Sequence, residues 1–447
     1  MKNLQKYLRH SGFVRYLRNT SWLAGGQAIR MVIGLLVSLA IARHLGPDDF
    51  GLFSLILSVV ALVGVGSTLG IESVAKREFV VRPEEGPQIL GTCFVVSGVT
   101  AAVLFVCLLV GGITIVSDRF TLVLLSILGA SILFYPSRFI DVWFQAQARG
   151  DLSVLSSVSV LICFAFIKMI ALIAESPLLI FCIIYLLELG AIAVVQCFFY
   201  LKHFGPIRRF SFSSARAKSL IAESWPLVFS AMAITVYTHI DQVMLGAYLG
   251  QEAVGEYAAA SKISSIFNLF PVIIAASLFP AIVNAKTLGA EIYQKRLQYY
   301  FDLNGGLAYA VVLPMSFLAP WLIRFLYGPD YIGGGGVLAI QAWSALFVFS
   351  GVARNQFLIA ESLLKFSLIA TLLGAVLNVG INFWLIPRYG GIGAAVATVV
   401  SYSVSAYFSS LLLSRMRPVF MMQTKSLCLL FNPTRLVREI LRIGSIK

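Results

Sequence analysis

The chain has few charged residues for its length, and this shortage excludes most classes of soluble protein. Of its 447 residues, 12% are charged and 59% are hydrophobic, whereas a soluble globular domain carries about 25% charged residues. So few charges could not cover a surface that contacts water. The sequence therefore predicts an integral membrane protein.

Several motifs are also missing. The six cysteines lie in apolar stretches without a CxxC pair or a histidine at ligand spacing, so neither a disulfide framework nor a metal site is expected. No cleavable signal peptide is evident, because the apolar run after the basic N-terminus is too long. The glycine run IGGGGV at 332–337 lacks the GxxxxGK[ST] pattern of a phosphate-binding loop, and we expect a loop or hinge there. We predict no cofactor and no enzymatic activity.

Long hydrophobic runs, in contrast, are abundant. A helix needs about 20 apolar residues to cross a bilayer, and twelve such runs can be identified. They are too long, and alternate too little, for the strands of a β-barrel. The predicted spans are residues 20–43, 51–75, 88–116, 120–145, 152–174, 177–201, 222–248, 257–283, 300–327, 334–360, 364–387 and 391–414.

Lysine and arginine are distributed unequally between the two sides that these spans define. The termini and the even-numbered loops hold 27 of the 34, the odd-numbered loops hold five, and Arg30 and Lys168 lie inside spans. Because positive residues are retained in cytoplasmic loops, both termini are predicted to be cytoplasmic. Contact with the anionic lipids of the inner leaflet explains the net charge of +14. Nucleic acid is not an expected partner.

The pattern L-G-x-x-x-x-G occurs twice, at 45–51 and at 249–255, and a Ser-Trp pair precedes each copy at similar spacing. This repeat predicts two six-helix bundles of the same polarity, related by a pseudo-two-fold axis along the membrane normal. The tail sequence PTRLVREILRIGSIK fits either an amphipathic surface helix or a disordered segment. The predicted order is a basic cytoplasmic N-terminus (1–19), an N-terminal bundle (20–201), a basic cytoplasmic linker (202–221), a C-terminal bundle (222–414) and a basic cytoplasmic tail (415–447).

The sequences that surround the two turns, IARHLGPDDFGLFSLILSVVALVGVGSTLGIESVAKRE at 41–78 and DQVMLGAYLGQEAVGEYAAASKI at 241–263, resemble the polysaccharide transporter family. This family of O-antigen-type oligosaccharide flippases belongs to the multidrug/oligosaccharidyl-lipid/polysaccharide exporter superfamily. The resemblance extends over nearly all twelve predicted helices. It implies a central cavity between two lobes, and export of a polyprenyl-diphosphate oligosaccharide from the inner to the outer leaflet of the bacterial cytoplasmic membrane by alternating access. The product would serve cell-surface polysaccharide synthesis.

The same resemblance implies glycosyltransferases and a polysaccharide polymerase as partners, and it leaves the oligomeric state open. A second function also fits the sequence, namely Na⁺- or H⁺-coupled drug extrusion as in the sister branch of the superfamily. A membrane enzyme such as a polymerase fits less well, because every odd-numbered loop is short.

Charged groups inside the spans are the first candidates for a substrate path, since each costs about 2.5–3.5 kcal/mol or more within a bilayer. Arg30 shares a helix face with Gln27, and we expect both to line the cavity and bind a diphosphate or sugar-acid charge. A structural partner for Arg30, or snorkelling to the membrane surface, is the alternative. Asp241 in the seventh span is a candidate for a cation or proton site or for a partner of an arginine, and His239 is a candidate proton switch. Helix termination or a contact between the lobes is the alternative for Asp241.

Further polar residues in the spans have two interpretations each. Lys168 and Glu188 could pair across neighbouring helices or face the cavity, and Asn378 and Asn382 could bind sugar hydroxyls or join helices.

Two pairs near the cytoplasmic ends of spans are expected to act structurally or as gates. Arg138 and Asp141, three residues apart, are predicted to neutralise each other. Arg354 and Glu361 are predicted to form part of an inner gate.

Overall fold

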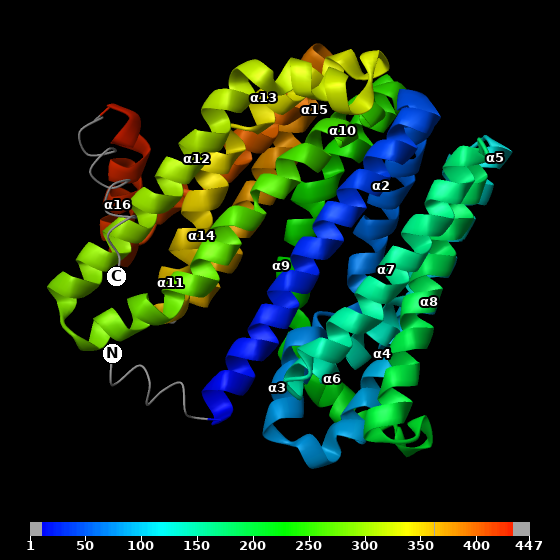
Figure 1. Ribbon diagram of the computed structural model, residues 1–447, viewed down its shortest axis with the longest axis horizontal. Helices are drawn as coiled ribbons and strands as arrows, with labels where there is room; N and C mark the ends of the chain where they lie inside the picture. The colour runs from blue at the N-terminus through cyan, green and yellow to red at the C-terminus, as the bar shows by residue number, and fades with distance from the viewer. Residues whose placement is uncertain (1–10, 362, 432–447) are drawn as a thin grey trace. The chain divides into compact units, whose positions relative to one another are not determined.

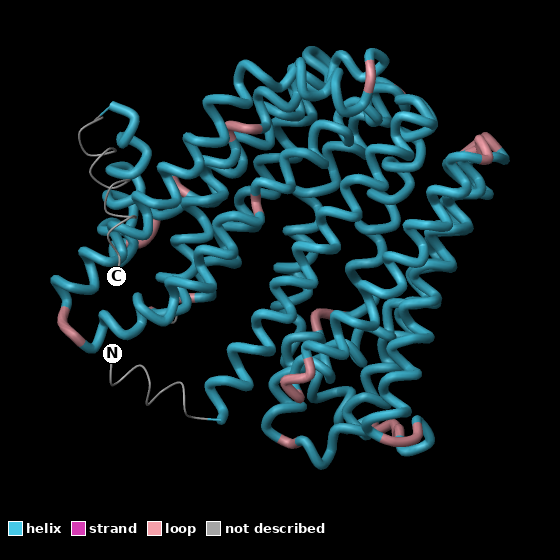
Figure 2. The backbone as a smooth tube through the Cα atoms, in the orientation of Figure 1, coloured by secondary structure: helices cyan, strands magenta, loops and turns pink. Residues whose placement is uncertain are grey.

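The computed structural model describes residues 11–361 and 363–431. These residues form helices and no strand, as Figure 2 shows, so the predicted all-α class is confirmed. The α-helices are α2 (Ser11–Gly64), α3 (Ile71–Val81), α4 (Gly86–Ile115), α5 (Arg119–Gly129), α6 (Arg138–Ala146), α7 (Gly150–Ile173), α8 (Leu178–Phe204), α9 (Ser214–Leu249), α10 (Gln251–Phe267), α11 (Leu269–Thr287), α12 (Ala290–Tyr327), α13 (Ile332–Gln341), α14 (Ser344–Ala360), α15 (Leu364–Ala406) and α16 (Arg417–Leu427). The 3₁₀ segments are η1 (Val65–Thr68), η2 (Pro83–Glu85), η3 (Ala130–Ser137), η4 (Ile207–Arg209), η5 (Pro329–Tyr331), η6 (Phe408–Leu411), η7 (Ser414–Met416) and η8 (Cys428–Phe431).

The chain divides into two compact units. Unit 1 contains residues 11–45 and Phe53–Thr235, and unit 2 contains Gly46–Leu52 and residues 236–431. Helix α7 lies beside α8 in unit 1, and α12 lies beside α13 and α14 in unit 2 (Figure 1). Because α2 and α9 each contribute to both units, the boundaries fall inside helices, and the domain limits predicted from the sequence stay a prediction.

The tail predicted at 415–447 is described only in part. Its first portion forms α16, which lies beside α12 in unit 2 and buries Gln423 completely. The amphipathic segment PTRLVREILRIGSIK lies outside the described residues.

The helices have the length and surface of membrane spans. Within the described residues, nine are long and apolar enough to cross a bilayer, or up to ten if the bent pair Pro329–Gln341 and Ser344–Ala360 counts as one span. Large apolar side chains remain exposed along them, for example Ile173 at 81% and Phe317 at 83%. Such a surface suits contact with hydrocarbon. The chain is a multi-pass membrane protein, whereas the count of twelve spans and their orientation stay predictions.

Both copies of the L-G-x-x-x-x-G turn interrupt a helix at their first glycine. Gly46 has a φ of 74° inside α2, and Gly250 has a φ of 86° between α9 and α10. These positive φ values favour glycine. The second glycines bring the two copies together, because a Cβ on Gly51 would lie 1.9 Å from a backbone oxygen of the other turn, and a Cβ on Gly255 would lie 2.0 Å from one. The repeated turns therefore pack backbone against backbone within unit 2.

The glycine run at 332–337 does not form the predicted loop. It lies in α13, and a Cβ on Gly335 would approach the Cα of Pro320 in α12 to 2.7 Å. The prediction was wrong because glycines within an apolar stretch also allow close helix packing.

An aromatic core holds the short helices of unit 1 in place. Phe79 of α3 and Trp143 of α6 meet edge to face with 5.0 Å between ring centroids, and Tyr200 of α8 is buried in the same core. These contacts fix one face of α3 and one face of α6. Their opposite faces carry polar side chains, which line the site described below.

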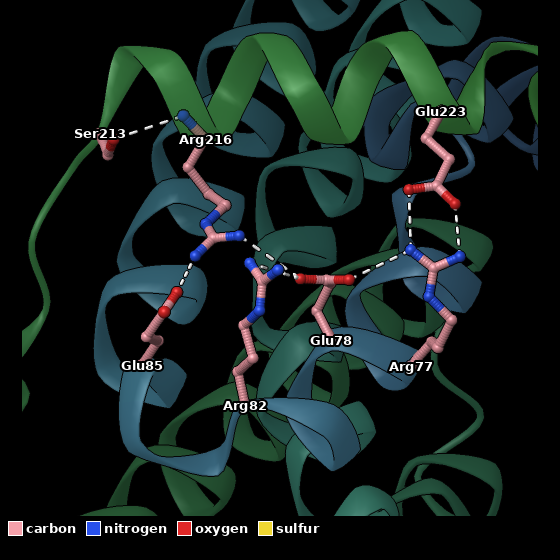
Figure 3. Close-up of polar contacts among 7 residues, drawn as sticks. All are labelled: Arg77, Glu78, Arg82, Glu85, Ser213, Arg216 and Glu223. Atoms are coloured by element: carbon pink, nitrogen blue, oxygen red, sulfur yellow. Dashed lines mark hydrogen bonds and ion pairs between the residues drawn. The ribbon is translucent and has the colours of Figure 1, made fainter.

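Ion pairs attach the first half of α9 to the end of α3. Arg77 forms a two-pronged ion pair with Glu223 of α9, and Arg216 of α9 pairs with Glu78 and Glu85 (Figure 3). Exposed ion pairs are individually weak, but several charges in one network fix geometry better than a single pair. This network holds the first half of α9 within unit 1.

Candidate functional site

Unit 1 contains a cavity of about 610 Å³ between α2, α3, α6, α7 and α8, here called the cationic cavity. This volume is within the range of about 300–1,000 Å³ that small-molecule sites occupy. Most of the lining side chains are polar or charged, which is unusual between membrane helices. The lining residues are Leu23, Gln27, Arg30, Glu72, Ser73, Lys76, Arg138, Asp141, Val142, Gln145, Ser153, Ser157 and Gln196.

Arg30 is held in this cavity by two neutral partners. Its Nη1 donates to the Oγ of Ser157 at 2.8 Å, and its Nη2 donates to the Oε1 of Gln27 at 2.8 Å. Asp141 is near enough to act on Arg30 electrostatically, but no described carboxylate forms an ion pair with Arg30 within 4.0 Å. The guanidinium is therefore oriented while its positive charge stays available to a ligand.

The acidic residues of the cavity have partners of their own. Ser153 and the Nε2 of Gln145 both donate to the carboxylate of Asp141, the latter at 2.8 Å. The Oε1 of Gln145 accepts from the Nζ of Lys76 at 2.9 Å. Lys76 thus resembles Arg30 in having a neutral partner, and among the described residues it has no ion pair within 4.0 Å.

The predicted pairing of Arg138 with Asp141 was wrong. The Nε of Arg138 lies 3.4 Å from the Oε1 of Glu72 in α3, while Asp141 is bonded by Ser153 of α7. Two side chains three residues apart on α6 thus reach neighbours on different helices. The i, i+3 spacing favours a pair on one helix, but packing of α3 and α7 against α6 brings other partners closer.

Several lining residues were missed because the sequence did not predict α3. Its buried residues Ile71, Val74 and Phe79 follow helical spacing, which leaves Glu72 and Lys76 on the opposite face, toward the cavity. The apolar periodicity was present in the sequence, but the segment was divided between the end of a span and a loop.

Lys168 and Glu188 lie apart from the cationic cavity. The Nζ of Lys168 contacts the Oε2 of Glu188 at 2.5 Å, and the side chains are 13% and 10% exposed. The pair connects α7 with α8, and neither residue is among those that line the cavity.

Unit 2 has a different polar centre around Asp241 of α9, here called the Asp241 cluster. The carboxylate is 3% exposed and accepts hydrogen bonds from Tyr257 of α10, from the Oγ1 of Thr398 at 2.7 Å and from the Nδ2 of Asn382 at 2.5 Å. That Nδ2 also donates to the Oδ1 of Asn378 at 3.1 Å. Asn382 and Thr398 both belong to α15, which folds back between them at Gly390.

The Asp241 cluster contains a negative charge whose contacts are all neutral. Among the described residues, no cation lies within 4.0 Å of the Asp241 carboxylate, and neither the Oδ1 of Asn382 nor the Nδ2 of Asn378 has a hydrogen-bond partner. His239, two residues before Asp241 on α9, is half-buried. An uncompensated buried carboxylate beside an unused amide oxygen can accommodate a small cation or a proton.

Arg354 and Glu361, which were predicted to belong to one inner gate, bind different partners in the structure, and the gate stays a prediction. Arg354 is 4% exposed, and its Nη1 donates to the backbone oxygen of Ser405 at 2.8 Å and to the Oγ of Ser409 at 2.7 Å. Glu361 pairs instead with Lys286, whose Nζ lies 2.8 Å away. Glu361 ends α14, where it reaches α11, whereas Arg354 faces the last turns of α15.

A family model described as polysaccharide biosynthesis protein matches residues 16–286, which is more than half of the chain. The chain belongs to this family. A second family model, MatE, matches residues 226–384. The resemblance found in the two turn sequences is thereby confirmed.

Similar proteins carry names related to that of the family. The chain is 23% identical over 375 residues to a probable low-salt glycan biosynthesis flippase, Agl15, of Haloferax volcanii, covering 81% of this chain and 76% of the relative. It is 22% identical over 217 residues to the capsular polysaccharide biosynthesis protein CapF of Staphylococcus aureus, covering 48% of this chain and 54% of the relative.

Solved structures show the same fold at low identity. An inward-facing multidrug resistance MATE family transporter of the MOP superfamily superposes with a TM-score of 0.69 at 14% identity, covering 87% of this chain and 95% of that one. The lipid II flippase MurJ in an inward closed conformation gives 0.68 at 15% identity, covering 94% and 95%. The chain therefore has a MATE- and MurJ-like fold.

Proposed function

We propose that this protein moves a lipid-linked oligosaccharide, carried on a polyprenyl phosphate or diphosphate, from the inner to the outer leaflet of the cytoplasmic membrane. The observation that supports this proposal is the pair of cavity cations, Arg30 and Lys76, whose hydrogen-bond partners are neutral. A phosphate group gives a guanidinium charge-assisted hydrogen bonds that neither glutamine nor serine can supply. The names of the relatives fit a glycan as cargo.

The cavity residues would replace the hydration of the head group. Arg30 is already oriented by Gln27 and Ser157, so binding costs little side-chain entropy. Lys76 adds a second positive charge from α3, and the polar lining can accept sugar hydroxyls. The polyprenyl chain would stay in the bilayer while alternating access exposes the head group to the other side. Glycosyltransferases would supply this cargo and a polymerase would use it.

Twelve spans with both termini inside are part of this proposal. Two of the candidate spans, Asn19–Val81 with 63 residues and Lys365–Leu411 with 47, are far longer than the roughly 20 residues that one crossing needs. Each has a glycine with non-helical dihedral angles inside it, Gly46 and Gly390. Division at these glycines turns ten candidate spans into twelve. Labelling of single cysteines at Asp118, Gly205 and Asp330 tests this, because only the second should be reached from the cytoplasm.

The transport assay compares Arg30→Ala with Arg119→Ala in proteoliposomes that contain a fluorescent polyprenyl-diphosphate oligosaccharide. Arg119 is exposed at the start of α5 and outside the cavity, so its loss removes the same charge without touching the site. We expect Arg30→Ala to abolish translocation, Arg30→Lys to retain part of it, and Arg119→Ala to match the unsubstituted protein. Equal rates for Arg30→Ala and Arg119→Ala would reject the proposal.

The Asp241 cluster supports the second candidate, cation-coupled drug extrusion, and it also supports cation coupling of glycan transport. A proton or monovalent cation at Asp241 would neutralise the buried charge in one state of the transport cycle. The two functions differ in what accumulates when the gene is deleted. We expect undecorated cell surfaces and retained lipid-linked oligosaccharide, whereas a change in dye efflux with normal glycolipid would favour drug extrusion.

A further inference from the structure

A second cavity of about 320 Å³ adjoins the cationic cavity in unit 1. Arg138 and Gln196 line both cavities, so the two spaces meet at these side chains. The rest of its wall comes from η3 and α8 and differs in character. It contains three aromatic rings, those of Phe134, Tyr135 and Tyr185, and we call it the aromatic cavity.

Two buried polar groups in the aromatic cavity have no hydrogen-bond partner among the described residues. Gln196 is 5% exposed and its Oε1 accepts no hydrogen bond, and Ser131 is 1% exposed with an unpaired Oγ. Buried polar atoms are almost always paired, because an unpaired one loses its hydration without compensation. These two groups can form hydrogen bonds with a ligand that carries hydroxyl groups.

The aromatic rings are held in fixed positions around these polar groups. The guanidinium of Arg138 lies 5.5 Å from the centre of the Tyr135 ring, and Tyr185 meets Phe53 edge to face at 6.1 Å. A pyranose ring has an apolar face of C–H groups and an edge of hydroxyls. The C–H face can pack against the aromatic rings, and the hydroxyl edge can form hydrogen bonds with Gln196 and Ser131. An alkyl chain would fit the rings but would leave both polar groups unpaired.

We infer that the aromatic cavity binds the first sugar ring of the cargo, the one joined directly to the phosphate. This inference rests on the proposed function, since it places the phosphate in the cationic cavity. Arg138 stands where the two cavities meet, so it contacts the phosphate–sugar linkage. Along α8, Tyr185 and Gln196 are eleven residues apart, or about 16 Å. We expect this cavity to discriminate between sugars, whereas Arg30 and Lys76 would recognise the charge that every such cargo shares.

The experiment measures dissociation constants of citronellyl diphosphate and of its glucosyl, galactosyl and N-acetylglucosaminyl derivatives for the full chain in detergent. We expect at least one sugar to raise the affinity about tenfold over the sugar-free probe. Ser131→Ala and Tyr185→Leu should remove most of that gain and leave the affinity for the sugar-free probe unchanged. Phe181→Leu is the matched control, because Phe181 is buried one turn from Tyr185 on α8 and lines neither cavity.

The outcomes separate this inference from the proposed function. Loss of sugar-free binding in Arg30→Ala, without a gain from any sugar, would keep the function and overturn the aromatic cavity as a sugar site. If none of the probes binds, the proposed function itself is wrong. If Tyr185→Leu alters affinity only when citronellyl is lengthened to farnesyl, the cavity holds lipid and the inference is wrong. Ser131→Ala is the smaller change, so it still tests the inference if Tyr185→Leu does not fold.

Discussion

Arg30 in unit 1 and Asp241 in unit 2 are both charged groups within apolar helices, but their surroundings differ. Arg30 borders a cavity of about 610 Å³ with further cations on its wall, whereas Asp241 is 3% exposed and surrounded by hydroxyl and amide groups. The first arrangement has room for a large anion, whereas the second is a buried carboxylate without a described cavity beside it. Under the proposed function, cargo would bind in unit 1 and a coupling ion or proton would bind in unit 2.

The largest effect on cargo binding is expected from Arg30→Ala. Two charge-assisted hydrogen bonds to a diphosphate, each worth about 1.5–3 kcal/mol, would be lost, so affinity should fall at least about 100-fold. Titration of the purified protein with citronellyl diphosphate measures this. Arg119→Ala serves as the control and should bind the probe as the unsubstituted protein does. An unchanged dissociation constant for Arg30→Ala would place the head group elsewhere.

Asp241→Asn should lower gradient-driven transport but leave probe binding nearly unchanged. It retains the shape of the side chain but removes the charge, so gradient-driven transport should fall about tenfold or more. Binding of citronellyl diphosphate should stay within about twofold, because the Asp241 cluster does not line the cationic cavity. Transport rates with and without a Na⁺ or pH gradient provide the measurement. A large loss of probe binding in Asp241→Asn would mean that the two sites are not separate.

Glu72→Gln should improve binding. Glu72 forms an ion pair with Arg138 at 3.4 Å, and the two side chains are 33% and 57% exposed. Removal of the carboxylate releases a cation to the cavity, and affinity for a diphosphate should rise, though by no more than about fivefold given the solvent exposure of the pair. The result that would contradict this account is weaker binding, since it would show that Glu72 positions Arg138 instead of competing for it.

The smallest effect on binding is expected at the Lys168 and Glu188 pair. Lys168→Met should leave a buried carboxylate without its partner and lower the thermal midpoint by several degrees. The double variant Lys168→Met with Glu188→Leu should recover most of that loss. Probe affinity should be unchanged in both, and a tenfold loss would bring the pair into the binding site.

The sequence could predict features that depend on neighbours along one helix. Gln27 and Arg30 share a face because they are one turn apart, and the structure joins them by a hydrogen bond. The apolar runs and the repeated turns indicated the fold class for the same reason, since each is local.

Features that depend on packing between helices were harder to predict from the sequence. Asn382 and Thr398 meet at Asp241 because α15 folds back at Gly390, and a single sequence does not show which residues a fold-back brings together. Thr398 was therefore missed although Asn382 was singled out. Arg138 was assigned a partner on its own helix, but Glu72 from α3 was closer once the aromatic core had placed the two helices.

The most direct test of the central claim is to locate the head group. A photoreactive citronellyl-diphosphate sugar would be cross-linked to the full protein, and the adducts would be mapped by proteolysis and mass spectrometry. The account predicts adducts on α2, α3, α6, α7 and α8, which line the cationic cavity, and on η3 of the aromatic cavity. These adducts should be lost in Arg30→Ala but not in Arg119→Ala. Adducts confined to α10–α15, or adducts on α2 that persist without Arg30, would contradict it.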